Sequence, residues 1–579
     1  MKYLARWFLV LALVIGCAGC TGLPTSGVVG SAPREGSSQD PGDVAIIPDP
    51  PSQGASPSQI VQGFLNAMVN SEQGYATARA YLTHTASAAW TPDAEALIYA
   101  SGITPRVNGD QVSITGALVG RLSADGAYSS VDNPSWTHDF GLVIEDNQWR
   151  ISRPTTGLAL SQYMFSQTYT RVEAYFFDDT ATVLVPDSRY VPIGSWNAAR
   201  AVRLVLNGPS TWLSPVTDNT YRSRVELDSD VYTSGGGVLT VPLSGEAAGL
   251  DIQPATQLAL EIAATTRDMA SVVWIRLTVA GQGLALDPRM GAATDDALAK
   301  VAADQYTRAS SSAPADLFFV SSGYVYRADA TTRSRLPSDW GTTPHDISSF
   351  AVNRDSAVIA AATPDGLLVG GAFDGELTIE LSEPGILRPQ FASDRTLWAM
   401  ASNPQGTAAW TRYGGTMHQV AATGLAGLVV QGFQLAPDGR RVLLLVRPVQ
   451  DPEGPMRVGV ALITTTNGQP SSIVSFKQIQ ATFQGSVMTS IIDAAWMGPS
   501  SMVLLGATQQ GRAAEVFYTD RDGLSVEEWG NPEQWAATQM AAHAQQVSVL
   551  EEQGQVWTYQ EGQQWAKVGD NVSAIAYPG

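Results

Sequence analysis

The chain has 579 residues, of which 44% are apolar, enough for three or four domains with cores of their own. Its 34 basic and 54 acidic residues give a net charge of −20, which repels phosphate backbones and anionic lipid headgroups and argues against nucleic acid as a partner. Both cysteines, Cys17 and Cys20, lie near the start, so the body of the protein has no disulfide framework.

The first residues have the pattern of a secretory signal peptide. Lys2 and Arg6 give a basic start, and the apolar run Trp7–Ile15 is followed by small residues. The run is about half the length of a stable membrane-spanning helix, which favours a cleaved signal over a retained anchor. Small residues before a cysteine resemble the bacterial lipobox, in which the sulfur receives a diacylglyceryl group and the new amino end is acylated, as with palmitate. The sequence therefore predicts a lipid anchor.

Two cysteines compete for that modification. Cys20 follows Ala18 and Gly19, and cleavage before it defines a signal peptide of residues 1–19. Cys17 is the alternative, although its use leaves a very short signal. A third reading is an ordinary cleaved leader with two unmodified cysteines. We predict Cys20 as the lipid-attachment residue, which places the mature protein on the extracytoplasmic face of the cell membrane.

Residues 20–57 are rich in proline, glycine and serine and predict a tether that spans about 35 Å on average. Residues 58–160 predict the first domain. A helix begins at Pro57-Ser58, a second covers 75–90, and strands follow over 111–119, 137–144 and 148–151. Helices followed by a meander indicate an α+β domain, which looks like the nuclear-transport-factor-2-like cone. That fold often encloses a pocket.

Residues 168–290 predict a second α+β domain. Strands are expected over 171–178, 183–191, 237–243 and 271–280, with helices over 196–206 and 253–269. The first helix ends at Asn207-Gly208-Pro209, where glycine permits a left-handed cap and proline stops the helix. The set "YFFDD", "LVPDSRYV", "AVRLVLNGPS" and "VVWIRLTVAG" resembles the GerMN module, whose known roles are in assembly at the cell surface.

Residues 291–314 predict a connection between domains. Thr294–Ala309 has the spacing of an amphipathic linking helix, and Ser310–Pro314 has the composition of a hinge. The pair Asp295-Asp296 would then lie at the helix N-terminus, where carboxylates are favoured.

Residues 315–579 predict an all-β propeller. A unit of strand, tight turn and more apolar strand recurs about every 40 to 45 residues, with one spacing near 60 that holds an extended loop over Arg447–Met456. Six blades are favoured and seven is the alternative. The last strand is completed by the hairpin of 316–326, which closes the ring and removes exposed edges. "TPDG" and "APDG" are tight turns, at 363–366 and 436–439. Four tryptophans are expected in blade cores, Trp398, Trp410, Trp496 and Trp557.

No catalytic, cofactor-binding or metal-binding pattern stands out. The five histidines are dispersed, with none at i+2 to i+4 from another: His84, His138, His345, His418 and His543. Nucleophile elbows, phosphate loops and dinucleotide fingerprints are absent from the sequence. The acidic pairs Asp178-Asp179 and Asp295-Asp296 are interpreted as a hairpin turn and a helix start. The sequence predicts a protein that is not an enzyme and has no cofactor.

Taken together, the lipobox, the tether and the three domains resemble the actinobacterial LpqB lipoprotein family over essentially the whole chain. "LPTSG" from Leu23 is similar to the family's opening after its lipidated cysteine, and "FLNAM", "ARAYLT" and "ASAAW" resemble its first domain. The resemblance implies a partner of the extracellular domain of the MtrB sensor kinase, acting on the response regulator MtrA, cell-wall homeostasis and division. Cys17 departs from the family pattern and puts the modified position in doubt.

Two other functions remain as hypotheses. One is a surface receptor for a small molecule or cell-wall glycan, which would bind in the first domain's cone or in the propeller channel. The other is a hydrolase whose active site lies within the propeller. The first predicts ligand-dependent stabilisation, and neither is marked by a sequence motif.

Overall fold

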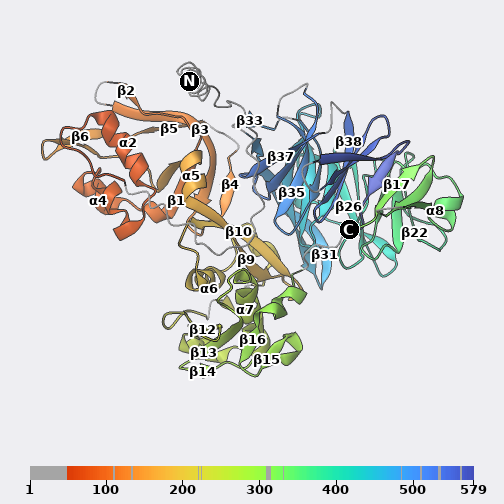
Figure 1. The fold of residues 1–579 in the computed structure, drawn as a ribbon, viewed down its shortest axis with the longest axis horizontal. Coiled ribbons are helices and arrows are strands. Elements are labelled where there is room, and N and C mark those ends of the chain that lie inside the picture. The colour runs from red at the N-terminus through yellow and green to blue at the C-terminus, as the bar shows by residue number, and fades with distance from the viewer. Residues whose placement is uncertain are drawn as a thin grey trace, which may run out of the picture. The chain divides into compact units, whose positions relative to one another are not determined.

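The computed structural model describes residues 48–108, 111–131, 135–218, 221–222, 225–307, 315–329, 332–483, 486–488, 490–508, 512–531, 536–560 and 564–579. They belong to one structural unit, residues 46–579 (Figure 1). The predicted signal peptide 1–19, Cys17 and Cys20 lie outside the described residues, as do most of the tether and the hinge Ser310–Pro314.

The first domain is α+β, as predicted. Its sheet has the order β2-β3-β1-β8, in which β8 runs parallel to β1, and β4 and β5 also pair with β3. A separate hairpin is formed by β6 and β7. The elements are α2 (Pro57–Ala67), η1 (Glu72–Gly74), α3 (Ala76–Arg79), α4 (His84–Ala89), η2 (Pro92–Ala94), β1 (Glu95–Tyr99), β2 (Arg106–Asn108), β3 (Gln111–Ser123), β4 (Tyr128–Ser130), β5 (Ser135–Asp139), β6 (Leu142–Glu145), β7 (Gln148–Ile151) and β8 (Leu158–Ser161).

Helix α2 forms where it was predicted. The Ser56 backbone N–H donates to Gln59 Oε1 at 2.8 Å, half of a capping box, and a proline occupies the first turn. The apolar face of α2 is buried, and Phe64 packs against Trp90 and Phe140 with ring centroids 5.3 and 6.3 Å apart. This aromatic cluster fills the interior of the first domain.

Two other predictions for this domain need correction. The helix expected over 75–90 is broken into α3 and α4, because Thr83 begins a new helix by accepting a hydrogen bond from the Ala86 N–H at 3.1 Å. The strand expected over 137–144 is divided into β5 and β6 at Gly141, whose φ is +55°. Both breaks are local interruptions of an otherwise correct pattern.

The second domain contains a βαβ unit and a separate strand pair. Strands β12 and β13 are parallel and connected by α7, in the sheet β11-β12-β13-β16-β15. The elements are α5 (Gln162–Thr168), β9 (Tyr169–Phe177), β10 (Leu184–Pro192), α6 (Ala198–Asn207), η3 (Ser214–Val216), β11 (Tyr232–Thr233), β12 (Val238–Leu243), η5 (Gly245–Gly249), α7 (Ile252–Thr265), β13 (Trp274–Val279), β14 (Gln282–Gly283), η6 (Pro288–Met290), β15 (Ala292–Thr294), β16 (Ala297–Ala299) and η7 (Lys300–Gln305). Helix α6 ends at Gly208, as predicted, but with φ +85° and ψ 179° this glycine has an extended backbone of positive φ and not the left-handed cap that was expected.

The linking helix predicted over Thr294–Ala309 does not form as one helix, and of its described residues only Lys300–Gln305 are helical, as the 3₁₀ helix η7. The first part of the segment forms the hairpin of β15 and β16, and Leu298 of β16 is fully buried opposite Ile275 of β13. Asp295-Asp296 therefore lies at a hairpin turn instead of a helix start, with Asp296 3.2 Å from Arg276. The gain from adding an apolar strand to the sheet outweighs the helical spacing of the segment.

The third domain is a propeller with six four-stranded sheets among the described residues, which confirms the favoured blade count. Its elements are β17 (Leu317–Ser321), β18 (Tyr324–Ala328), β19 (Arg333–Arg335), α8 (Asp339–Thr342), β20 (Ser349–Val352), β21 (Val358–Ala362), β22 (Leu367–Ala372), β23 (Thr378–Ser382), β24 (Gln390–Phe391), β25 (Leu397–Asn403), β26 (Gly406–Tyr413), β27 (Thr416–Val420), η8 (Thr423–Leu425), β28 (Leu428–Leu435), β29 (Arg441–Pro448), β30 (Arg457–Thr466), β31 (Gln469–Ile479), β32 (Thr482–Phe483), β33 (Ser486–Val487), β34 (Ser490–Trp496), β35 (Ser501–Ala507), β36 (Glu515–Asp520), β37 (Val526–Gly530), β38 (Ala537–His543), β39 (Gln546–Glu551), β40 (Val556–Gln560), β41 (Gln564–Gly569) and β42 (Ala574–Ala576).

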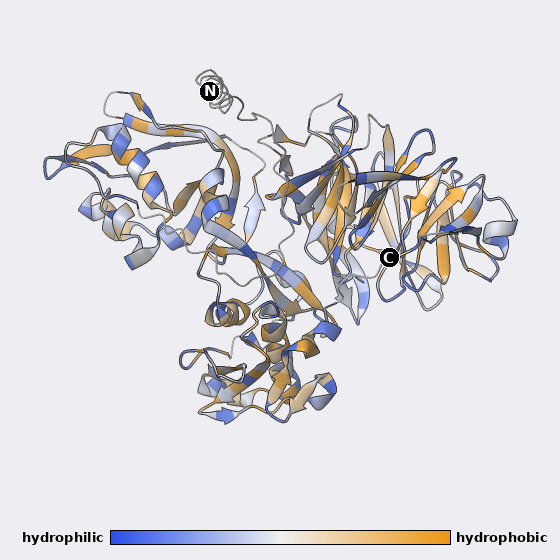
Figure 2. Ribbon diagram, viewed as in Figure 1, coloured by the Kyte–Doolittle hydropathy of each residue, from blue (hydrophilic) through white to orange (hydrophobic). Residues whose placement is uncertain are grey.

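The ring closes as predicted, by pairing the last strand with the first hairpin. Strand β42 joins β17 through Ile575 opposite Phe319. The innermost strands contact one another in the order β42, β20, β24, β28, β34, β38 and back to β42. Figure 2 shows apolar residues concentrated in the blade strands and polar ones in the connecting turns. Trp398 and Trp496 are buried as expected, whereas Trp410 and Trp557 are half-buried.

An ion pair crosses the propeller channel. Arg388, just before β24, donates to Asp493 Oδ2 of β34 at 2.6 Å and to the carbonyl of Met540 in β38 at 3.0 Å. The same Asp493 oxygen accepts the Met540 N–H at 2.8 Å. The three residues belong to different blades, so side chains bridge the propeller channel where Arg388 meets Asp493.

Candidate functional site

The strand pair of β9 and β10, here called the β9–β10 ribbon, connects the three domains. On the side of the first domain, the Tyr190 N–H donates to the Gly126 carbonyl at 2.8 Å. A Cβ added to Gly126 would lie 2.7 Å from the Tyr190 carbonyl oxygen, so this turn needs glycine for close approach. Arg189, only 1% exposed, pairs with Asp125 at 2.7 Å and with Asp187 at 2.6 Å. The ribbon is thus held by buried charge as well as by backbone.

The other side of the ribbon contacts the propeller. Arg171 Nη2 lies 2.9 Å from Asp520 Oδ1, and the Tyr190 hydroxyl donates to Asp522 Oδ2 at 2.9 Å. Burial raises the pKa of Tyr190, and the neighbouring Asp522 carboxylate raises it further. The phenol therefore stays protonated and remains a donor to Asp522.

The acidic pair Asp178-Asp179 lies where the β9–β10 ribbon contacts the propeller, here called the junction. Asp178 is fully buried, and Arg440 of the propeller donates to its Oδ2 from Nε at 2.9 Å. The N–H groups of Thr182 and Val183 donate to Oδ1 at 2.7 and 2.9 Å. Burial opposes ionisation, but the Arg440 charge and these hydrogen bonds hold the pKa of Asp178 below its ordinary value. Asp178 belongs to a hairpin turn, as interpreted, and also pairs with a residue from another domain.

Lys477 of the propeller contacts the first domain directly. Its Nζ donates to the carbonyl of Tyr128 in the first domain at 2.5 Å and lies 5.8 Å from the Trp212 ring centroid. Burial, and then the neighbouring Arg521, lowers the pKa of Lys477 to about 8. Sequence reasoning missed this lysine because its partners are far away in the chain.

Asp520 makes the junction sensitive to pH. Burial raises the pKa of its carboxyl from 3.8 to about 6, against the opposing charge of Arg171, while Asp522 and Glu173 raise it further. In the unfolded chain the carboxyl loses its proton near pH 4, so the stabilising contribution is complete below that pH and is lost as the pH rises to about 6.

We expect Asp520→Asn to remove this loss. Between pH 4 and 7, the free energy of unfolding of the variant should rise by about 2 kcal/mol relative to wild type, measured by denaturant titration at each pH. The prediction concerns the difference in free energy of unfolding between variant and wild type, because carboxyls with a lowered pKa, such as Asp178, make both proteins more stable as the pH rises. Asp230→Asn, at an exposed carboxylate, is the control. If the free energies of unfolding of wild type and variant change with pH by the same amount, the prediction is wrong.

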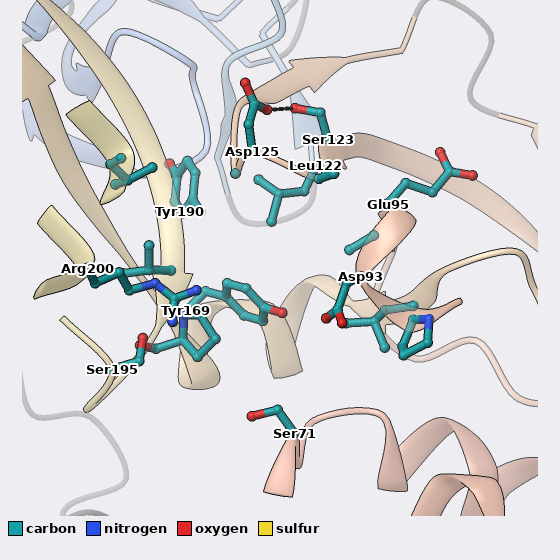
Figure 3. A pocket seen from close by; sticks show the side chains of 18 of the residues that line it. Ser71, Asp93, Glu95, Leu122, Ser123, Asp125, Tyr169, Tyr190, Ser195 and Arg200 are labelled. Atoms are coloured by element: carbon teal, nitrogen blue, oxygen red, sulfur yellow. Dashed lines mark hydrogen bonds between the residues drawn. The ribbon is translucent and has the colours of Figure 1, made fainter. Parts of the chain in front are cut away.

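A groove of about 580 Å³ opens beside the ribbon, between the first and second domains (Figure 3). Its first-domain wall comes from Ser71, η2, the start of β1 and the turn after β3. Its second-domain wall comes from the ends of the ribbon and one face of α6. The polar residues that line it include Ser71, Tyr75, Asp93, Glu95, Ser123, Asp125, Tyr169, Tyr190, Ser195, Asn197, Arg200, Arg203 and Asn207.

Opposite charges face this groove. Figure 3 shows Tyr169 between Arg200 on one wall and Asp93 on the other. Burial raises the pKa of Tyr169 to about 12, with Asp93 raising it and Arg200 lowering it. Tyr75 lies deeper and has a left-handed backbone, with φ +61° and ψ +40°, which is unusual for a bulky residue. Sequence reasoning predicted α6 and missed the groove that it faces.

The histidines are dispersed in the structure as well. Among the described residues, one group has a geometry able to hold a cation, His84 with Glu145 and Asp146. His84 Nδ1 lies 2.7 Å from Glu145 Oε1, but its side chain is 85% exposed. An exposed cluster of this kind is not in itself a metal site. No helix in the described part of the chain combines the length and apolar character needed to span a membrane.

Three protein-family models match the chain. "Lipoprotein LpqB, N-terminal domain" covers residues 50–166, "Sporulation and spore germination" covers 173–285, and "Lipoprotein LpqB beta-propeller domain" covers 323–578. A lipoprotein-type first domain, a germination-type second domain and a terminal propeller define a multidomain protein of the lipoprotein class. The chain belongs to the LpqB lipoprotein family.

Relatives of this family match along nearly the whole chain. Lipoprotein LpqB of Cutibacterium acnes is 27% identical over 99% of both chains. The Streptomyces coelicolor protein of the same name is 25% identical over 98% of this chain and 96% of its own. A crystal structure of TolB from Acinetobacter baumannii is 12% identical and matches 61% of this chain and 99% of its own at a TM-score of 0.35. None of these LpqB names describes an enzymatic reaction.

Proposed function

We propose that this protein is a lipid-anchored, non-enzymatic regulatory partner on the extracytoplasmic face of the cell membrane. It contacts the extracellular domain of a two-component sensor kinase of the MtrB–MtrA type and so links that kinase to cell-wall homeostasis and division. The anchor is the acylated Cys20, or Cys17 in its place. Membership of a lipoprotein family over nearly the whole chain supports the anchor.

One structural observation supports the regulatory role: the β9–β10 ribbon is joined to its neighbouring domains by buried and half-buried charges. Asp178 with Arg440, and Arg171 with Asp520, join the second domain to the propeller. A tethered chain that holds its domains together in this way presents a defined surface, which suits recognition of a protein partner at low ordering cost.

The test is photo-crosslinking of the full-length lipoprotein in membranes. A crosslinking amino acid is placed at one exposed apolar position in each domain, Ile144, Val301 and Ile379, which are 64%, 70% and 66% exposed. We expect at least one position to give a covalent adduct with a sensor kinase, identified by mass spectrometry. The matched control is the buried position Phe64, which should give none. Failure of all three positions, extended to Val107, Tyr163, Tyr232 and Val487, would count against a kinase partner.

A receptor for a small molecule is the second candidate function. The groove between the first and second domains favours it, since about 580 Å³ lies within the range of ligand sites. The ion pair of Arg388 and Asp493 makes the propeller channel a poorer place for a ligand.

A further inference from the structure

We propose that the groove between the first and second domains binds a short peptide that carries a free carboxylate and an amino group. The site differs from the cone interior and the propeller channel, and it does not depend on the kinase partnership. The argument uses the charges on the two walls, the groups between them and the volume of the groove.

The second-domain wall is an anion-binding face. Arg200, Arg203, Leu204 and Asn207 line the groove from α6, at the i, i+3, i+4 and i+7 spacing that places residues on one helix face. Arg203 lies 3.9 Å from the Asp230 carboxylate, which is 99% exposed, a pair too loose to neutralise the arginine. Two arginines on one helix face favour a carboxylate, to which a guanidinium group can donate two hydrogen bonds.

The electrostatic setting of Arg200 supports this assignment. Its charge acts on the hydroxyls of Tyr75 and Tyr169, which line the same groove. The chain as a whole carries a net charge of −20, so two arginines on one groove wall depart from the general character of the molecule. An anion meets positive charge on this wall, whereas the carboxylates of the lining, Asp93, Glu95 and Asp125, lie on the first-domain wall.

The opposite wall favours a cation. Asp93 is exposed at the groove, and Glu95 is half-buried with Arg121 at 3.1 Å as its partner. Because Asp93 acts on the same two tyrosines as Arg200, the two charges share one cavity. A ligand with an amine at one end and a carboxylate at the other can pair with the charges on both walls. A ligand with a single charge is attracted by one wall and repelled by the other.

Other groups of the second-domain wall suit a peptide backbone. Tyr169 and Tyr190 provide aromatic surface. The Ser195 hydroxyl, the Asn197 NH₂ group, whose Oδ1 accepts the Arg200 N–H, and the Asn207 amide can pair with peptide N–H and C=O groups. A volume of about 580 Å³ accommodates a few residues. A zwitterionic lipid headgroup shares the charges but makes less use of these amide partners.

The test uses the detergent-solubilised full-length protein and three pools of mixed-sequence tetrapeptides: free at both ends, amidated at the carboxyl end, and acetylated at the amino end. Binding is followed by isothermal titration and by saturation-transfer NMR. We expect the free pool to bind about tenfold more tightly than either blocked pool. In the double variant Arg200→Gln/Arg203→Gln, the preference for a free carboxylate over an amide should disappear. In Asp93→Asn, the preference for a free amine should disappear.

Arg106→Gln is the matched control, since Arg106 is an exposed arginine of the first domain away from the groove. It should bind all pools as wild type does. Circular dichroism and the unfolding temperature establish that every variant is folded. The proposal is overturned if no pool binds up to about 1 mM, or if the carboxylate preference survives in the double variant. It is also overturned if phosphatidylethanolamine vesicles, and not peptides, bind in an Arg200-dependent manner.

Discussion

Replacing Asp178 by alanine is expected to lower the free energy of unfolding by about 3–5 kcal/mol, among the largest effects of a single substitution. The change removes the carboxylate that Arg440 hydrogen-bonds, leaving only the longer ion pair with Asp179 at 3.7 Å, and leaves the N–H groups of Thr182 and Val183 without their acceptor. Denaturant titration followed by tryptophan fluorescence measures the effect. Because three domains unfold, each transition is fitted separately, and the loss should fall on the transition that separates the second domain from the propeller.

A double-mutant cycle isolates the pair. Arg440→Ala removes the charge but leaves Asp178 with its backbone donors, and the double variant should be more stable than the sum of the two losses predicts, by about 0.5–3 kcal/mol. Asp230→Ala is the matched control in the same domain, because Asp230 is 99% exposed, and it should change stability by no more than about 0.5 kcal/mol. Strict additivity, or an effect of Asp178→Ala as small as the control, would show that the pair contributes nothing to holding the domains together.

The elements that could be predicted from sequence are those with local causes. Helix α2 has its capping residues next to it, and α6 ends at a glycine with φ +85°. The blades were countable because each is a meander whose neighbouring strands are consecutive in the chain. In these elements the pattern and the physical cause lie within the same few residues.

The elements that could not be predicted depend on partners far along the chain. The segment of Leu298 has helical spacing, but an open edge of β13 is available for it, and a periodicity argument does not see that edge. The parallel pairing of β1 with β8 joins segments some sixty residues apart, and neither was predicted as a strand. The local sequence pattern predicts secondary structure poorly where a segment pairs with the edge of a sheet formed by distant residues.

The same limit applies to the junction and the groove. Asp178-Asp179 was correctly placed at a turn, yet its partner Arg440 follows the "APDG" turn of a propeller blade 262 residues away. Arg200 and Asp93 face one groove because the β9–β10 ribbon docks on the turn at Gly126. Each residue type was visible in the sequence, but the opposition of their charges exists only after the domains have docked.

Replacing both Cys17 and Cys20 by alanine is expected to move nearly all of the protein from the membrane to the soluble fraction. Two or three acyl chains on one residue anchor a protein firmly, at about 0.8 kcal/mol per buried CH₂. A net charge of −20 gives the body no electrostatic attraction to anionic lipid. Fractionation of cells by ultracentrifugation with immunoblotting measures the change.

The single variants decide which cysteine is used. If Cys20 carries the lipid, Cys20→Ala should give the soluble phenotype and Cys17→Ala should leave the protein in the membrane, with mass spectrometry of the amino-terminal peptide of the wild type showing an acylated Cys20. The opposite result would assign the anchor to Cys17. Retention of the double variant in the membrane would mean that another segment or a bound partner holds the protein there. That outcome would remove the lipid anchor from the proposed function while leaving the ribbon and the groove as they are, because both are built from residues after the tether.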